Sequence, residues 1–203
     1  MKTTFIASLF AFAALALATP APQEVSISTI SKEDSAALKK GPKDDSSWSG
    51  LDDSQARSVC NSWRNIYGKG SKYKDTCNSI LTNDFEAYSC STQTTWGKRP
   101  TSNCQLCNSR DVFTNDILSS LPKLAEAKIL SYYYTKKTVI LYANIRFQKS
   151  RDFVAVIFMI TTEWSKKKGV QISKIEYEYD TLDYVTNYDS KKKCSALPFK
   201  GNW

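Results

Sequence analysis

The second half of the chain holds four long β-forming runs in close succession, and no other feature constrains the fold as much. The runs are rich in β-branched and aromatic residues, and connections of only four or five residues separate them. Connections that short join consecutive antiparallel strands. The sequence therefore predicts a four-stranded meander, with strands at Ala127–Tyr134, Val139–Phe147, Phe153–Trp164 and Val170–Asp180.

The third and fourth runs predict how this sheet is covered. Phe153–Ile160 is apolar at every position, so both faces of that strand need a cover. In the fourth run Ile175, Tyr177 and Tyr179 alternate with charged residues, which predicts one buried and one solvated face. A central strand that is buried twice indicates a curved sheet wrapped around a helix.

Three helices are predicted before the meander. The first follows a cap at Asp52, Asp53 or Ser54 and ends at Gly68, with an apolar stripe at helical spacing formed by Ala56, Val59, Cys60, Trp63, Ile66 and Tyr67. The second spans Tyr73–Leu81, and the third spans Ser109–Leu121 before Pro122. A short strand is predicted over Asp84–Cys90. We thus expect an α+β fold in which three N-terminal helices pack into a strongly curved, mainly antiparallel sheet, a cone or half-barrel.

The N-terminal segment is typical of a signal peptide. Lys2 precedes an apolar run from Phe5 to Leu17, and Ala16-Leu17-Ala18 matches the pattern before a cleavage site. The run is too short for a membrane span, so no transmembrane segment is expected. We expect residues 1–18 to be removed, 19–50 to form a disordered leader, 51–194 to form the domain, 195–203 to form a tail, and the protein to be secreted into the extracellular space.

Six cysteines follow the N-terminal segment, and export would place them in an oxidising compartment. We expect all six to be oxidised and structural, while the pairing stays open among 15 connectivities. Cys104 and Cys107 form a C-x-x-C motif, but the polar loop before it does not favour a thioredoxin-type site, and no second motif supports zinc. The expected disulfide cysteines are Cys60, Cys77, Cys90, Cys104, Cys107 and Cys194.

The chain contains no histidine, which closes several routes to catalysis. A Ser-His or Cys-His nucleophile pair, a histidine base and an imidazole metal ligand are all excluded, and we expect neither a metal nor a cofactor. The net charge is +8, carried by scattered lysine clusters. This pattern favours a solvated surface, with an anionic polymer as the alternative partner and nucleic acid not favoured.

The order of the predicted elements resembles the nuclear transport factor 2-like (SnoaL-like) superfamily. Two segments carry the resemblance: the helix from Val59 leading into Ile80–Tyr88, and the closing strand Ile175–Asp180. The entry Ser109-Arg110-Asp111-Val112-Phe113 is similar to that of secreted fungal proteins with this domain. The resemblance covers roughly Leu51–Cys194 and implies an α+β cone with a pocket between helices and sheet.

This resemblance, together with the aromatic content, suggests a small, disulfide-stabilised and non-catalytic pocket protein. It would bind a small apolar ligand, or contact a host or cell-surface partner as an effector does. The expected pocket residues are Tyr67, Phe85, Tyr88, Phe113, Tyr177 and Tyr179. The alternative is a histidine-independent isomerase, cyclase or dehydratase that uses Asp84 or Asp180 with a tyrosine. An open cone would favour a ligand or catalysis, whereas a filled cone would favour surface contact.

Overall fold

Five helical regions and six strands make up the fold in the computed structural model, which describes residues 32–42, 48–100, 102–148, 150, 152–181 and 184–185. The helices before the sheet are α1 (Lys32–Lys39), α2 (Asp53–Tyr67) and α3 (Tyr73–Ile80). Strand β1 (Leu81–Tyr88), helix α4 (Cys90–Thr95) and strand β2 (Gln105–Cys107) follow. A helix with a π-helical turn in its middle comes next, formed by α5 (Arg110–Val112), η2 (Phe113–Ile117) and α6 (Leu118–Ser120). The meander closes the fold, with β3 (Leu124–Tyr134), β4 (Thr138–Phe147), β5 (Val154–Ser165) and β6 (Gly169–Tyr179).

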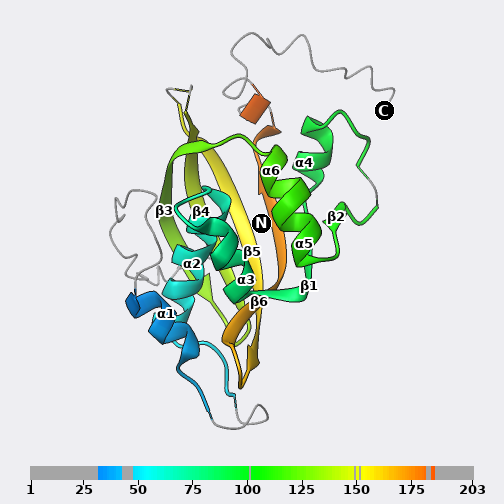
Figure 1. Cartoon of the computed structure of the whole chain (residues 1–203). Coiled ribbons are helices and arrows are strands. Elements are labelled where there is room, and N and C mark those ends of the chain that lie inside the picture. The colour runs from blue at the N-terminus through cyan, green and yellow to red at the C-terminus, as the bar shows by residue number, and fades with distance from the viewer. Residues whose placement is uncertain are drawn as a thin grey trace, which may run out of the picture.

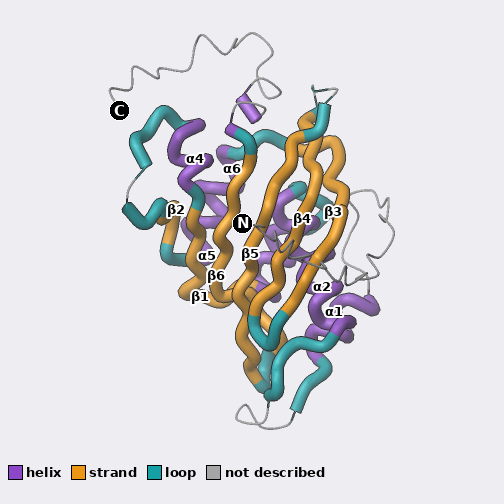
Figure 2. Tube along the Cα trace, turned by 180° about the vertical axis from the view of Figure 1, so that it is seen from behind, coloured by secondary structure: helices purple, strands orange, loops and turns teal. Residues whose placement is uncertain are grey.

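The strands form one mixed sheet in the order β2-β1-β6-β5-β4-β3. The pairs of the meander are antiparallel, whereas β1 lies parallel to β6. Figure 1 shows the helices on one face of this bent sheet, and Figure 2 shows the opposite face, which the described helices leave open. The predicted α+β fold with a strongly curved, mainly antiparallel sheet is confirmed.

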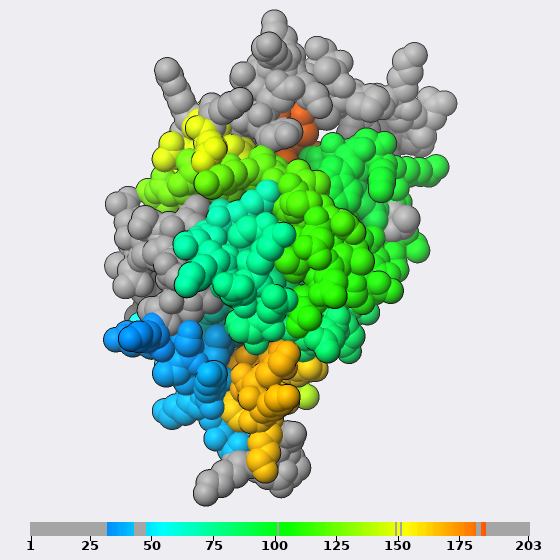
Figure 3. Space-filling model, viewed as in Figure 1, coloured from blue at the N-terminus to red at the C-terminus, as the bar shows by residue number. Residues whose placement is uncertain are grey.

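Helix α2 supplies the apolar ridge around which the sheet curves. Asp52 caps its N-terminus through a hydrogen bond from the Gln55 backbone N–H at 2.8 Å, and the Gln55 side chain completes a capping box. Trp63 and Ile66 on its inner stripe are fully buried. The space-filling view shows α3 and the helix Arg110–Ser120 lying side by side over the same face (Figure 3).

Part of the expected leader is folded, so the prediction of disorder over residues 19–50 is wrong for α1. The carboxylate of Asp34 accepts hydrogen bonds from Ser58 (3.1 Å) and Asn61 (3.0 Å) of α2. Leu38 is buried where α1 approaches the start of β6, and Gly169 there has a φ of 80° that favours glycine. Helix α1 is therefore stabilised by tertiary contacts, which its polar sequence does not predict.

Two further elements were not expected. Helix α4 and strand β2 lie in what the sequence suggested was a loop, and a disulfide between Cys90 and Cys104 joins that loop to the start of α4. The predicted strand over Asp84–Cys90 begins earlier, at Leu81, and ends at Tyr88.

Candidate functional site

The interior between helices and sheet is occupied by a cluster of six aromatic side chains, here called the interior aromatic cluster. Each is at most 5% exposed, and neighbouring ring centroids lie 4.8–6.4 Å apart. The members are Trp63, Tyr67, Phe85, Phe113, Phe158 and Tyr177. Such edge-to-face and tilted contacts are the arrangements that aromatic rings prefer in a packed core.

This cluster leaves almost no free volume. The cavity between α2 and strands β3 to β5, against Trp63, Tyr67 and Phe158, measures about 10 Å³. That is about the space for one water molecule. A small-molecule pocket usually needs several hundred Å³. Beside these three rings, the cone is filled.

Five of the six expected pocket residues are in the interior, and one is not. Tyr67, Phe85, Phe113 and Tyr177 belong to the cluster, while Tyr179 stacks on Tyr184 with ring centroids 4.2 Å apart.

Tyr88 lies on the outer face of the sheet instead. Its hydroxyl donates to Glu86 at 3.0 Å, and the Lys174 ammonium lies 5.8 Å from its ring centroid.

The hydroxyls of Tyr177 and Tyr179 are engaged in hydrogen bonds within the protein. The Tyr179 hydroxyl donates to Thr92 Oγ1 (3.3 Å), which in turn donates to the Tyr177 hydroxyl (3.1 Å). Burial raises the pKa of Tyr67 and of Tyr177 well above the ordinary value of 10. These phenols therefore remain protonated at neutral pH.

The two aspartates of the enzyme hypothesis do not meet. Asp84 is exposed near the beginning of β6, whereas Asp180 is exposed just beyond its end. At about 3.3 Å per residue, the length of β6 between them is roughly 20 Å. The two carboxylates cannot act together on one small substrate, and neither lies among the interior tyrosines.

The cysteines differ from the expectation. Cys90 and Cys104 form a disulfide with their Cα atoms 4.9 Å apart, while Cys60, Cys77 and Cys107 are free and buried. The prediction that all six are oxidised is therefore wrong for these three; Cys194 lies outside the described residues. Burial raises the pKa of Cys77 and of Cys107 to about 11, so both thiols are protonated and inert at neutral pH. Because Cys104 is bonded to Cys90, the C-x-x-C motif forms no redox pair.

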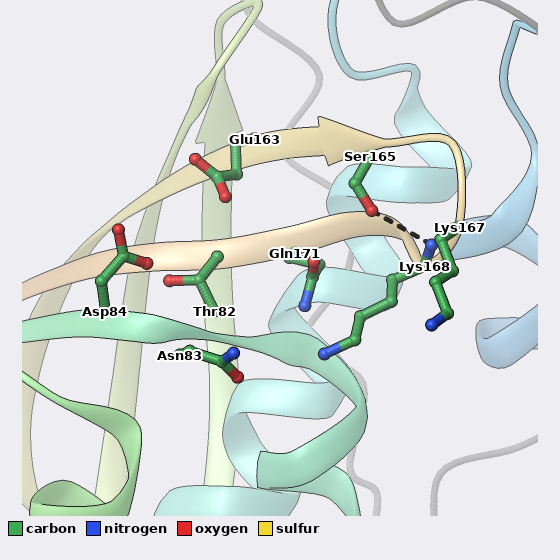
Figure 4. A pocket seen from close by; sticks show the side chains of 8 residues that line it. All are labelled: Thr82, Asn83, Asp84, Glu163, Ser165, Lys167, Lys168 and Gln171. Atoms are coloured by element: carbon green, nitrogen blue, oxygen red, sulfur yellow. Dashed lines mark hydrogen bonds between the residues drawn. The ribbon is translucent and has the colours of Figure 1, made fainter.

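Another hollow lies at the end of the sheet where β1 begins and β5 turns into β6. This cleft has a volume of about 420 Å³ and is open to solvent. Figure 4 shows Asp84 and Glu163 at one end, Lys167 and Lys168 at the other, and Thr82 with Gln171 between them. Burial and the nearby charge of Asp84 raise the pKa of the Glu163 carboxyl.

Sequence reasoning missed this cleft. The sequence indicates an acid–base candidate at Asp84 and a solvated surface at the lysine clusters, one of which is residues 166–168. The cleft forms where that turn approaches the start of β1. This approach depends on the parallel pairing of β1 with β6, which the sequence pattern did not predict. Among the described residues, no group of three or more acidic or cysteine side chains could hold a metal ion.

With the fold and these sites described, comparison with known proteins gives the family. The model of the NTF2-like domain matches residues 49–191. This chain belongs to the NTF2-like family. No curated protein matches its sequence.

Three solved structures illustrate what this chain is similar to. A protein from Kribbella flavida DSM 17836 is 11% identical, with a TM-score of 0.46, covering 71% of this chain and 98% of its own. An NTF2-like protein from Cytophaga hutchinsonii is 12% identical, with a TM-score of 0.44, covering 64% of this chain and 95% of its own. A protein assigned as a SnoaL-like polyketide cyclase from Jannaschia sp. CCS1 is 17% identical, with a TM-score of 0.46, covering 68% of this chain and 96% of its own. Identities and TM-scores this low say nothing about activity.

Proposed function

We propose that this NTF2-like chain is a non-catalytic, exported binding protein that acts through its surface. The supporting observation is the interior aromatic cluster, which leaves about 10 Å³ beside Trp63, Tyr67 and Phe158. A small apolar ligand would have to displace these rings, and an enzyme of this architecture would have no interior in which to hold a substrate. Members of the family can bind ligands or catalyse reactions, but both uses need a cavity.

The surface that supports the proposal is the outer face of β3, β4 and β5. Five large apolar side chains there are 38–53% exposed: Tyr133, Ile140, Tyr142, Ile157 and Met159. We call them the outer patch. They are neighbours across the strands, because Ile140 pairs with both Tyr133 and Met159, and Tyr142 pairs with Ile157. Scattered exposed apolar residues are ordinary, but a contiguous group of this size marks an interaction surface.

The occupant that fits this patch is another folded protein. The face is an open sheet surface (Figure 2), and its tyrosine and methionine content is typical of protein–protein interfaces.

The charges beside the outer patch indicate the charge expected on the partner's surface. Along β1 and β6, the outer face carries the carboxylates of Glu86, Glu176 and Glu178 against the single ammonium of Lys174. On this side of the outer patch, the acidic border disfavours contact with anionic lipid and nucleic acid. It favours a partner whose apolar surface has basic neighbours.

We propose export from the pattern of the N-terminal residues 1–18. None of the described helices is long and apolar enough to cross a bilayer, so we do not propose membrane anchoring through any of them. We expect the protein recovered from the culture medium of its producer to begin at Thr19. A mature chain that still carried the apolar run, or one found only inside the cell, would contradict export.

The interior is tested by native mass spectrometry of the purified protein before and after organic extraction. We expect both samples to have the mass of the polypeptide alone. A small apolar molecule that is retained before extraction would overturn the filled interior. Turnover of an enone or polyketide that disappears in Asp84→Asn or Asp180→Asn would establish the enzyme instead.

The outer patch is tested with a photo-crosslinking residue at position 142, and at the exposed helical position 112 as the control. We expect a discrete adduct with one other protein from position 142 only. With that partner purified, Ile157→Thr should weaken binding at least about tenfold, as loss of a central apolar contact does, while Val112→Thr should leave it unchanged. Adducts of the chain with itself, the same adducts from both positions, or unaltered binding by Ile157→Thr would each contradict the proposal.

A further inference from the structure

A break in the pairing of β1 with β6 creates the cleft beside Asp84. Leu81 pairs with Ile172, but the next pair joins Glu86 to Lys174. Strand β1 thus advances five residues while β6 advances two, so the segment between these pairs bulges away from its neighbour. Bulges of this kind occur beside binding sites, because they redirect side chains and leave backbone unpaired.

The bulge places a buried hydroxyl without a partner in the wall of the cleft. Thr82 is 5% exposed, and its Oγ1 has no hydrogen-bond partner among the described residues. Gln171 beside it is also buried, and its Nε2 donates to the Leu81 carbonyl oxygen at 3.3 Å. Buried polar atoms are nearly always satisfied, so an orphan hydroxyl in a cleft wall indicates that something else supplies the hydrogen bond.

The two ends of the cleft carry opposite charge. The carboxylates of Asp84 and Glu163 lie at one end, and the lysines at 167 and 168 lie at the other (Figure 4). Among the described residues, neither carboxylate has a salt-bridge partner. The Lys168 backbone N–H donates to Ser165 Oγ at 3.1 Å, which holds the β5–β6 turn closed beneath the two lysines.

We propose that this cleft binds a small zwitterion with an ammonium group at one end and a carboxylate at the other, as in a short peptide with free termini. The ammonium would lie between Asp84 and Glu163, the carboxylate near Lys167 and Lys168, and a polar group in the middle would meet Thr82. The volume of about 420 Å³ is within the usual range of small-molecule sites. This inference does not rest on the outer patch, since no residue of the patch lines the cleft.

Ligands of a single charge fit the cleft less well. The lysines would repel a polycation, and the two carboxylates would repel a free anion. Only the zwitterion pairs each end of the cleft with a group of opposite charge. Charged sites reject wrong partners by leaving one charge unpaired or repelled.

The test uses triglycine and two relatives that each lack one terminal charge, N-acetyl-triglycine and triglycinamide. An extended tripeptide spans roughly 10 Å. Titration at low salt, up to about 20 mM because a weak site is expected, is followed by backbone amide NMR of the intact protein. We expect the amides of residues 82–84 and 163–171 to shift with triglycine, and both relatives to bind about threefold to tenfold more weakly, the range for partly exposed ion pairs.

Variants separate the two ends of the cleft. Asp84→Asn and Lys167→Gln should each weaken triglycine about threefold or more, while the matched exposed controls Asp116→Asn and Lys123→Gln should not. Thr82→Val should weaken binding without lowering the melting temperature.

Three results would overturn the inference. Equal binding of N-acetyl-triglycine would show an anion site only, and equal binding of triglycinamide would show a cation site only. No shift at the highest concentration would show that the cleft binds no such ligand. None of these results bears on the filled interior or on the outer patch.

Discussion

The carboxylate of Glu178 accepts a hydrogen bond from the backbone N–H of Ser91 at 2.9 Å, although the two residues are 87 positions apart. Its other oxygen accepts from the Cys90 N–H at 2.7 Å, so one side chain of β6 caps the first turn of α4. An anion at a helix N-terminus stabilises the unpaired N–H groups there. Glu178→Gln should lower the free energy of unfolding by about 1 kcal/mol, measured by urea denaturation. The exposed Asp116→Asn is the control and should change it little.

The disulfide between Cys90 and Cys104 encloses a sequence separation of 14. Removing both sulfurs in a Cys90→Ala/Cys104→Ala variant should cost about 3 kcal/mol, because the unfolded chain regains that loop's freedom. Cys107→Ala should cost about 1 kcal/mol, the loss of a small buried side chain. A Cys107 that stays unmodified by a thiol reagent in the unfolded, unreduced protein would mean that Cys107 also forms a disulfide.

The buried thiols of Cys77 and Cys107 should react slowly with alkylating reagents. Their pKa of about 11 lies two units above the ordinary value of 9, so the thiolate fraction at pH 7.5 is about a hundredfold lower than in the unfolded chain. Iodoacetamide labelling with peptide mass mapping should modify both only after denaturation. Rapid labelling of either in the folded protein would contradict its burial.

Phe158 is the ring that joins the two sides of the interior aromatic cluster, with Tyr67 at 5.1 Å and Trp63 at 5.8 Å between centroids. Phe158→Ala should lower the free energy of unfolding by about 3–5 kcal/mol and leave an apolar cavity. Benzene should raise the melting temperature of this variant but not that of the parent protein, because only the variant has an empty apolar cavity.

Phe158→Leu, the control for that experiment, should lose about 1 kcal/mol and respond weakly to benzene. A parent protein that is itself stabilised by benzene would show that the cone already holds a usable cavity.

Two buried threonines offer a matched test of the orphan hydroxyl. Thr82 Oγ1 has no partner among the described residues, whereas Thr162 Oγ1 donates to the Lys137 carbonyl oxygen at 3.0 Å. In the absence of ligand, Thr82→Val should raise the free energy of unfolding by about 1 kcal/mol, and Thr162→Val should lower it by about as much. Thermal and urea unfolding measure both. Destabilisation by Thr82→Val would indicate that the hydroxyl is satisfied in solution.

Residue pattern alone predicted much of the fold. The meander, α2 and α3 came from periodicity and turn spacing, which are local properties of the chain. Helix α4 was missed because its stability comes from Ser89 and from Glu178, a residue far away in sequence. Helix α1 was missed for a similar reason, since Asp34 meets its partners only after α2 is in place.

The site was harder to predict. Phe85 and Tyr88 were both expected in the pocket, but residues three apart on a strand point to opposite faces, and Tyr88 is accordingly on the outside. The cysteine pairing failed because it depends on distances between Cα atoms, which spacing along the chain does not provide.

The sequence by itself determined the class of fold, the lack of histidine chemistry and the aromatic lining of the cone, because composition and periodicity act locally. The tertiary structure decided whether that lining encloses a cavity, because free volume depends on how Trp63, Tyr67 and Phe158 pack against one another. It also decided where the polar cleft lies. Asp84 and Lys167 come together only because β1 joins the sheet parallel to β6 and bulges away from it, a pairing between distant parts of the chain that no local pattern encodes.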